Sequence, residues 1–111
     1  MNKRVKQLWI EALRSGEYSQ TKSVLRDTYG FCCLGVLCDL HRIETEGDWA
    51  TSEDGGYYYG HQAEVMPIEV MEWAGLQSAN PDVDDDDTSL AGLNDDGLPF
   101  SQIADLIEQQ L

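Results

Sequence analysis

Lysine and arginine are missing from most of this chain of 111 residues, since none follows Arg42. Residues 1–43 hold all seven of these cations and four acids, whereas residues 44–111 hold 17 of the 21 acids. The formal net charge is −14. A charge of this size opposes bulk attraction to nucleic-acid phosphates and to an anionic membrane surface. We therefore expect neither nucleic acid nor membrane as a partner.

Long hydrophobic runs and cysteine pairs are also missing. No apolar run approaches the roughly 20 residues that cross a bilayer. The amino terminus is basic, but Glu11 and Arg14 interrupt the region where a secretory signal needs an unbroken apolar segment. The three cysteines, at positions 32, 33 and 38, do not form a disulfide framework. These absences predict a cytoplasmic protein with reduced thiols.

The length and the apolar fraction of 41% suit one small folded domain, which we expect to span residues 1–111. The chain has no internal repeat and no linker long enough to divide it. Its patterns alternate between helical and extended periods. We expect a small α+β domain of three or four helices packed with short antiparallel strands.

Four segments carry helical signals. Residues 5–13 place their apolar side chains on one stripe, and Gly16 follows as a stop. Residues 31–41 are apolar on nearly all sides, which predicts a buried core helix in which Gly35 allows another element to approach closely. A short helix is expected between Pro67 and Gly75. A last helix begins at about residue 99 or 101, with Ser101 as its N-cap.

Short strands are predicted over residues 22–26 and 89–93, each followed by a turn, at 27–30 and 94–97. Asp54-Gly55-Gly56 predicts the turn of a weak hairpin between Trp49 and the aromatic run 57–59. We expect residues 80–88, which are rich in aspartate, to form a polar loop.

Two metal sites are conceivable from spacing, and neither is predicted. Cys38 and His41 lie one helical turn apart, and Cys33 or His61 would complete a zinc shell, but the usual paired spacing is absent. Buried free cysteine is the more common explanation.

A calcium loop starting at Asp84 would place Asp86, Thr88 and Asp95 at ligand positions. It has Ser89 where glycine is needed and lacks the final glutamate. We expect no metal and no cofactor.

The acidic half of the chain suggests one function, a DNA-mimic-like inhibitor that occupies the basic groove of another protein. Glu69, Glu72, Asp105 and Glu108 have no lysine or arginine in their own half, so internal ion pairs are not expected to account for them.

Cations and amides near the core helix suggest another function, which is the binding of a small anion such as a nucleotide. There is no glycine-rich phosphate loop, nucleophile elbow or paired-histidine helix, so we do not expect an enzyme. The predicted polar contacts to the ligand come from five residues: Gln20, Lys22, Arg26, Asn94 and Asp95.

Two stretches resemble a family of small, mostly uncharacterised proteins of bacteriophages and bacteria. The first comprises Trp9-Ile-Glu-Ala-Leu-Arg-Ser-Gly16, Gln20 and Phe31-Cys-Cys-Leu-Gly-Val-Leu-Cys38. The second comprises Leu93-Asn-Asp-Asp-Gly97, Phe100 and Ile103-Ala-Asp-Leu-Ile-Glu108. The resemblance covers about half the chain and brings no catalytic residues. The polyaspartate loop is not part of the family pattern.

The resemblance implies a phage accessory protein. Such proteins often counter host defence, either by sequestering a signalling nucleotide or by blocking a defence protein. We therefore expect a non-enzymatic homo-oligomer in the host-cell cytoplasm that binds and sequesters a small anionic, nucleotide-like ligand. The alternative is an acidic inhibitor of a host defence protein.

Overall fold

The computed structural model describes residues 1–83 and 88–111. Within these residues the chain forms five helices and one two-stranded antiparallel sheet, which confirms the α+β class with more helices than the three or four predicted. The elements in chain order are α1 (Lys3–Arg14), α2 (Cys33–Thr45), β1 (Ala50–Thr51), β2 (Tyr57–Tyr58), α3 (Ile68–Ala74), α4 (Leu90–Asp95) and α5 (Phe100–Gln110).

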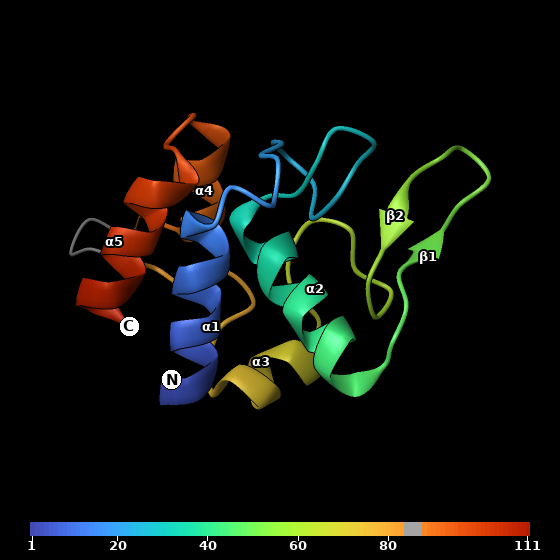
Figure 1. Ribbon diagram of the computed structural model, residues 1–111. Helices are drawn as coiled ribbons and strands as arrows, with labels where there is room; N and C mark the ends of the chain where they lie inside the picture. Colours follow the sequence, from blue (N-terminus) through green and yellow to red (C-terminus); the bar gives the residue numbers. More distant parts are fainter. Residues whose placement is uncertain (84–87) are drawn as a thin grey trace.

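The helices form the body of the molecule, with the β1–β2 hairpin at one side (Figure 1). Helices α1 and α5 pack side by side, α2 lies between α1 and the hairpin, and α3 crosses below α1 and α2. The long loop between α1 and α2 passes over the upper end of α2 and approaches the hairpin. This loop, α2 and the hairpin supply the residues of the site described below.

Helix α1 confirms the first predicted helix. Its apolar stripe is buried, and Trp9 is fully enclosed. Asn2 caps the helix by accepting a hydrogen bond from the Val5 backbone N–H at 3.0 Å. The indole of Trp9 donates to the Cys33 carbonyl at 3.0 Å, so α1 is joined to the first turn of α2.

Helix α2 confirms the predicted core helix, although it starts two residues later and continues to Thr45. Residues 33–38 are all buried, as expected for a segment that is apolar on all sides. A Cβ on Gly35 would lie 1.8 Å from the Leu25 carbonyl oxygen. The close approach predicted at Gly35 is therefore made by the loop residue Leu25.

Both predicted strands outside the hairpin are wrong. Residues 22–26 form only an isolated bridge between Arg26 and Phe31, because Ser23 has a left-handed φ of 72° that interrupts an extended run. Residues 89–93 lie at the start of α4, where the Ser89 hydroxyl accepts from the Gly92 backbone N–H at 3.1 Å. This N-cap favours a helix over a strand.

The hairpin and the third helix are confirmed. Ala50 pairs with Tyr58 and Thr51 pairs with Tyr57. Helix α3 follows Pro67 and ends at Gly75, whose φ of 71° is left-handed.

The N-cap of α5 is Pro99 rather than Ser101, since the helix already begins at Phe100. The proposed calcium loop includes residues 84–87 and so falls partly outside the described residues. Among the described helices, none has the length and apolar character needed to cross a membrane.

Candidate functional site

Three of the five predicted ligand contacts form hydrogen bonds within the protein. Asn94 is fully buried, and its Oδ1 accepts from Gln20 Nε2 at 2.9 Å and from the Cys33 backbone N–H at 3.2 Å. Its Nδ2 donates to the Thr21 carbonyl at 2.7 Å. Asp95 accepts from the Ser23 backbone N–H at 2.8 Å. These bonds hold the loop before α2 against α4.

The other two predicted contacts are the cations. Lys22 is exposed on the same loop segment that Asn94 and Asp95 hold. Arg26 lines a pocket that none of the other four residues lines. The structure thus brings Gln20, Asn94 and Asp95 together beside Lys22, and it places Arg26 in a separate site.

The Arg26 pocket has a volume of about 420 Å³ and lies between the α1–α2 loop, α2 and the hairpin. The Arg26 guanidinium carbon is 4.4 Å from the centre of the Tyr57 ring, 5.0 Å from Phe31 and 5.5 Å from Trp49. These distances are typical of cation–π contacts. The lining residues are Arg26, Phe31, Asp39, Arg42, Asp48, Trp49 and Tyr57.

Asp39 organises the α2 side of this pocket. It is only 6% exposed, and it accepts hydrogen bonds from Arg42 Nε at 2.7 Å, Trp49 Nε1 at 3.0 Å and the Tyr18 hydroxyl at 2.7 Å. Burial opposes ionisation of Asp39, but these three donors outweigh it and lower the pKa of the carboxyl group. A charged Asp39 therefore orients Arg42 and Trp49 in the pocket.

The two arginines of the pocket differ in their partners. Arg42 pairs with Asp39, whereas Arg26 makes no ion pair with any carboxylate among residues 1–83 and 88–111. Lys3, Lys6 and Lys22 also make no ion pair among the described residues, but Arg26 is the one of these four cations that lines the pocket. Its contacts are aromatic rings, which hold the guanidinium in place without neutralising its charge.

A second pocket of about 410 Å³ lies on the other face of the hairpin. It is lined by Asp48, Ala50, Tyr58, Gly60 and His61. His61 has a left-handed φ of 69°. Asp48 lines both pockets.

The cysteines are unsuited to thiolate chemistry. All three are buried, and burial raises the pKa of Cys32 to about 11. The side chain of His41 contacts the Tyr59 hydroxyl at 2.5 Å. The described part of the chain contains no group of three or more side chains arranged to hold a metal ion.

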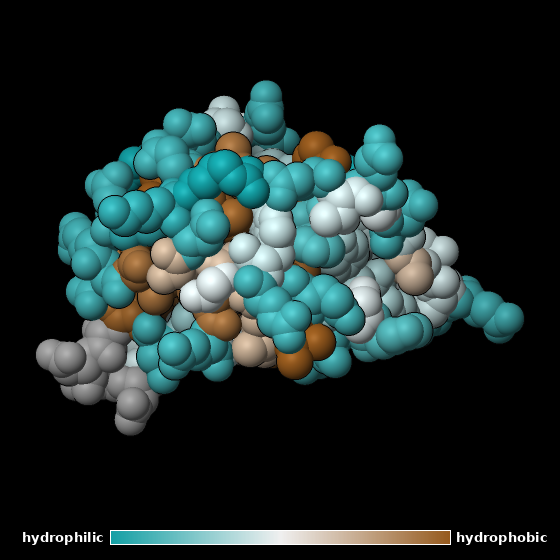
Figure 2. Space-filling model, turned by 90° about the horizontal axis from the view of Figure 1, so that it is seen from below, coloured by the Kyte–Doolittle hydropathy of each residue, from teal (hydrophilic) through white to brown (hydrophobic). Residues whose placement is uncertain are grey.

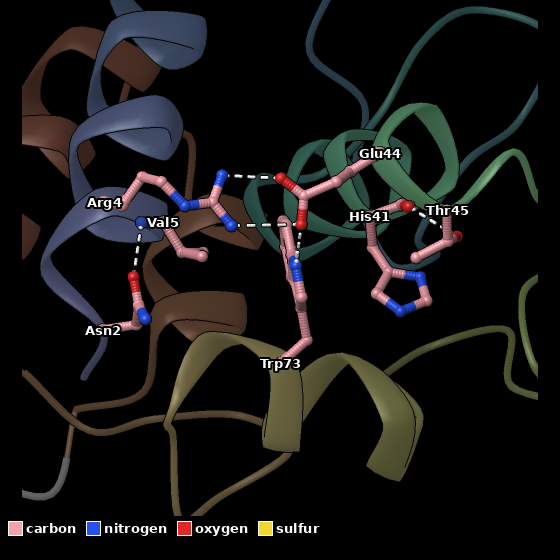
Figure 3. Close-up of polar contacts among 7 residues, drawn as sticks. All are labelled: Asn2, Arg4, Val5, His41, Glu44, Thr45 and Trp73. Carbon is pink, nitrogen blue, oxygen red and sulfur yellow. Dashed lines mark hydrogen bonds and ion pairs between the residues drawn. The ribbon is translucent and has the colours of Figure 1, made fainter.

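A polar cluster lies away from both pockets, where α1, α2 and α3 meet (Figure 3). Arg4 of α1 donates to Glu44 of α2 at 2.6 and 3.1 Å, and the indole of Trp73 of α3 also donates to Glu44. The ring of His41 packs edge-on against Trp73, with centroids 5.2 Å apart. These contacts join three helices, and they assign the cluster a structural role.

Internal ion pairs account for two of the acids that the sequence left without partners. Arg14 of α1 pairs with Asp105 at 2.6 Å and with Glu108 at 3.4 Å, both on α5. The expectation that internal pairs cannot explain these acids is therefore wrong, because the pairing crosses from one half of the chain to the other.

Glu69 and Glu72 are exposed on α3. Figure 2 shows the lower face, where hydrophilic residues predominate and hydrophobic residues form separate patches.

The sequence analysis named Arg26 as a ligand contact and named none of the other residues that line its pocket. Asp39 and Arg42 have opposite charges and lie three positions apart on the core helix. This spacing is typical of an ion pair within a helix and could have indicated the contact between them. Trp49 and Tyr57 belong to the aromatic hairpin. No spacing along the chain indicates that this hairpin meets Arg26, since the contact is tertiary.

A comparison with protein families matches a model described as Domain of unknown function (DUF8296) to residues 1–111. Comparison with curated proteins and with solved structures gives no match. The match spans the whole sequence, so the α1–α2 loop, α2 and the hairpin that form the pocket all lie within the family domain.

Proposed function

The chain belongs to the Domain of unknown function (DUF8296) family, and we propose that it binds a small anionic ligand with an aromatic ring, such as a nucleotide, in the Arg26 pocket. One observation carries this proposal. The Arg26 guanidinium is held by three aromatic rings and has no carboxylate partner among the described residues, while a second arginine lines the same pocket. Such a cation is available to an anion from outside the chain.

The chemistry of the pocket matches the parts of a nucleotide. Two guanidinium groups provide planar sets of N–H donors that suit phosphate oxygens. Trp49 and Tyr57 offer ring faces or edges to a base. The exposed carboxylate of Asp48 accepts hydrogen bonds from ribose hydroxyls or from a base amino group. A simple inorganic anion would use only the arginines.

We propose binding and sequestration rather than catalysis. The thiols are buried and their pKa values are raised, so they are poor nucleophiles. Asp39 is already engaged by three donors and is a weak base, because its pKa is lowered. The resemblance to phage accessory proteins supports the further proposal that sequestration removes a nucleotide signal of host defence.

The affinity of such a site follows from its contacts. Stacking of a base on an aromatic ring contributes about 1–3 kcal/mol, and each charge-assisted hydrogen bond contributes about 1.5–3 kcal/mol. After the cost of association, we expect a Kd between about 1 μM and 1 mM.

The test is thermal unfolding with a panel of nucleotides that includes AMP, cyclic nucleotides and ADP-ribose. At 100 times its Kd, a bound nucleotide adds about 2.7 kcal/mol of stability, which corresponds to a rise in Tm of about 10 °C or more. Arg26→Gln should abolish this rise. Lys3→Gln is the matched control, because it removes the same charge from an exposed position on α1, and it should leave the rise unchanged.

A panel that leaves the Tm unchanged contradicts the proposal, as does an Arg26→Gln variant that responds like the wild type. The alternative, an acidic inhibitor of a host protein, predicts salt-sensitive capture of a basic protein. That capture would persist in Arg26→Gln, so the variant separates the two functions.

A further inference from the structure

The two pockets lie on opposite faces of the same β-hairpin. Side chains alternate between the faces of a strand, so Trp49 and Ala50 point to opposite sides. Tyr57 and Tyr58 do the same on β2. Accordingly, Trp49 and Tyr57 line the Arg26 pocket, whereas Ala50 and Tyr58 line the second pocket. Asp48, next to Trp49 at the start of this ribbon, lines both.

The two pockets differ in the charge of the residues that line them. The Arg26 pocket contains two arginines, whereas none of the described residues that line the second pocket is a lysine or an arginine. The second pocket instead offers the Tyr58 ring, the His61 imidazole and the methyl group of Ala50. We therefore expect the anionic group of a ligand to lie in the Arg26 pocket and an uncharged ring to lie against Tyr58 in the second pocket.

A tight turn forms one edge of the second pocket. Gly60 and His61 both have positive φ, in a tight turn closed by hydrogen bonds between Tyr59 and Gln62 at 2.9 and 3.0 Å. Glycine and asparagine are the usual residues at such positions, and histidine is among the few others enriched there. The turn holds His61 at the edge of the pocket.

We propose that one two-lobed ligand, in which a phosphate-containing bridge joins two ring systems, occupies both pockets at once. This inference rests on the proposed function and names its ligand class more narrowly. One ring and the phosphates lie with Arg26 and Arg42. The part of the ligand that joins the phosphates to the second ring passes Asp48, and the second ring stacks on Tyr58. Each pocket, at about 410–420 Å³, is near the lower end of the range for small-molecule sites, which suits one lobe each.

The test compares calorimetric affinities for AMP, which has one lobe, with those for a linear dinucleotide, a cyclic dinucleotide and NAD. At least one two-lobed ligand should bind the wild type about tenfold or more tightly than AMP, because it adds a stacked ring. Tyr58→Ala should reduce that affinity to the level of AMP and leave AMP binding unchanged. Ala50→Glu is a second variant, which keeps Tyr58 and adds a carboxylate at an exposed position of the second pocket. It should have the same selective effect.

The outcomes separate the two proposals. If AMP binds but no two-lobed ligand binds more tightly, the two-pocket inference is wrong and the proposed function stands. The inference is also wrong if both variants, still folded by circular dichroism, weaken AMP and the two-lobed ligand equally. If no nucleotide binds the wild type, both proposals are overturned.

Discussion

Replacement of Asn94 by alanine should destabilise the protein strongly, because this buried amide joins α4 to the start of α2 and to the α1–α2 loop. The alanine variant leaves the Cys33 backbone N–H and the Thr21 carbonyl without the partners that they have at 3.2 and 2.7 Å. Gln20 keeps its bond to the Leu98 carbonyl at 2.8 Å.

The magnitude follows from these two lost partners. An unsatisfied buried polar group costs about 1–3 kcal/mol, so two groups cost about 2–6 kcal/mol. A small domain has only about 5–15 kcal/mol of stability in total. We therefore expect a decrease in Tm of about 10 °C or more, or a variant that is largely unfolded at 37 °C.

The assay is urea unfolding followed by circular dichroism, with Asp96→Ala as the control. Asp96 is the exposed C-cap of α4, and its substitution should change the stability by less than about 0.5 kcal/mol. A decrease of less than about 1 kcal/mol for Asn94→Ala would refute the structural role. If that variant also lost nucleotide binding at unchanged stability, Asn94 would contact the ligand, as the sequence predicted.

Two other perturbations test the packing around the pocket. Gly35→Ala should lower the free energy of unfolding by about 3 kcal/mol or more, because the added Cβ would lie 1.8 Å from a backbone oxygen. In the same urea assay, Gly92→Ala should change it by less than about 1 kcal/mol, because that Cβ would meet only the Ser89 hydroxyl, at 3.0 Å. Similar losses for both glycines would contradict the close packing of Leu25 on α2. Asp39→Asn should cost about 1–3 kcal/mol at pH 7. The folded pKa of Asp39 is lowered, so its contribution is present above the unfolded pKa of about 4 and is lost as the pH falls through the folded pKa. The difference between wild type and Asp39→Asn in urea should therefore shrink between pH 5 and pH 2, and a constant difference would exclude the charge-based role.

The helices with a clear apolar stripe could be predicted from the sequence, because burial of one face imposes a period that is visible in residues 5–13 and 103–111. Helix α4 could not be predicted on this basis. Its apolar stretch is too short for the period to separate a helix from a strand. The Ser89 N-cap was the better signal, and it is a local one.

The candidate site was predictable only in part. Arg26 could be chosen because cations are scarce in this chain. Its three aromatic neighbours come from positions 31, 49 and 57, which are brought together only when the hairpin packs beside the α1–α2 loop. Gln20, Asn94 and Asp95 form a polar group that does cluster, but their hydrogen bonds connect loop and helix, and the sequence gives no means to tell such bonds from ligand contacts.

The most direct test of nucleotide binding in the Arg26 pocket uses the three tryptophans of the chain as reporters. Of their indole N–H groups, that of Trp49 bonds to Asp39 in the pocket, that of Trp9 to the Cys33 carbonyl in the core, and that of Trp73 to Glu44. In ¹H–¹⁵N correlation spectra recorded during a nucleotide titration, the Trp49 resonance should shift in a saturable manner while those of Trp9 and Trp73 stay in place. A Trp49 resonance that does not move at saturating nucleotide, or three resonances that move equally, would contradict binding in this pocket.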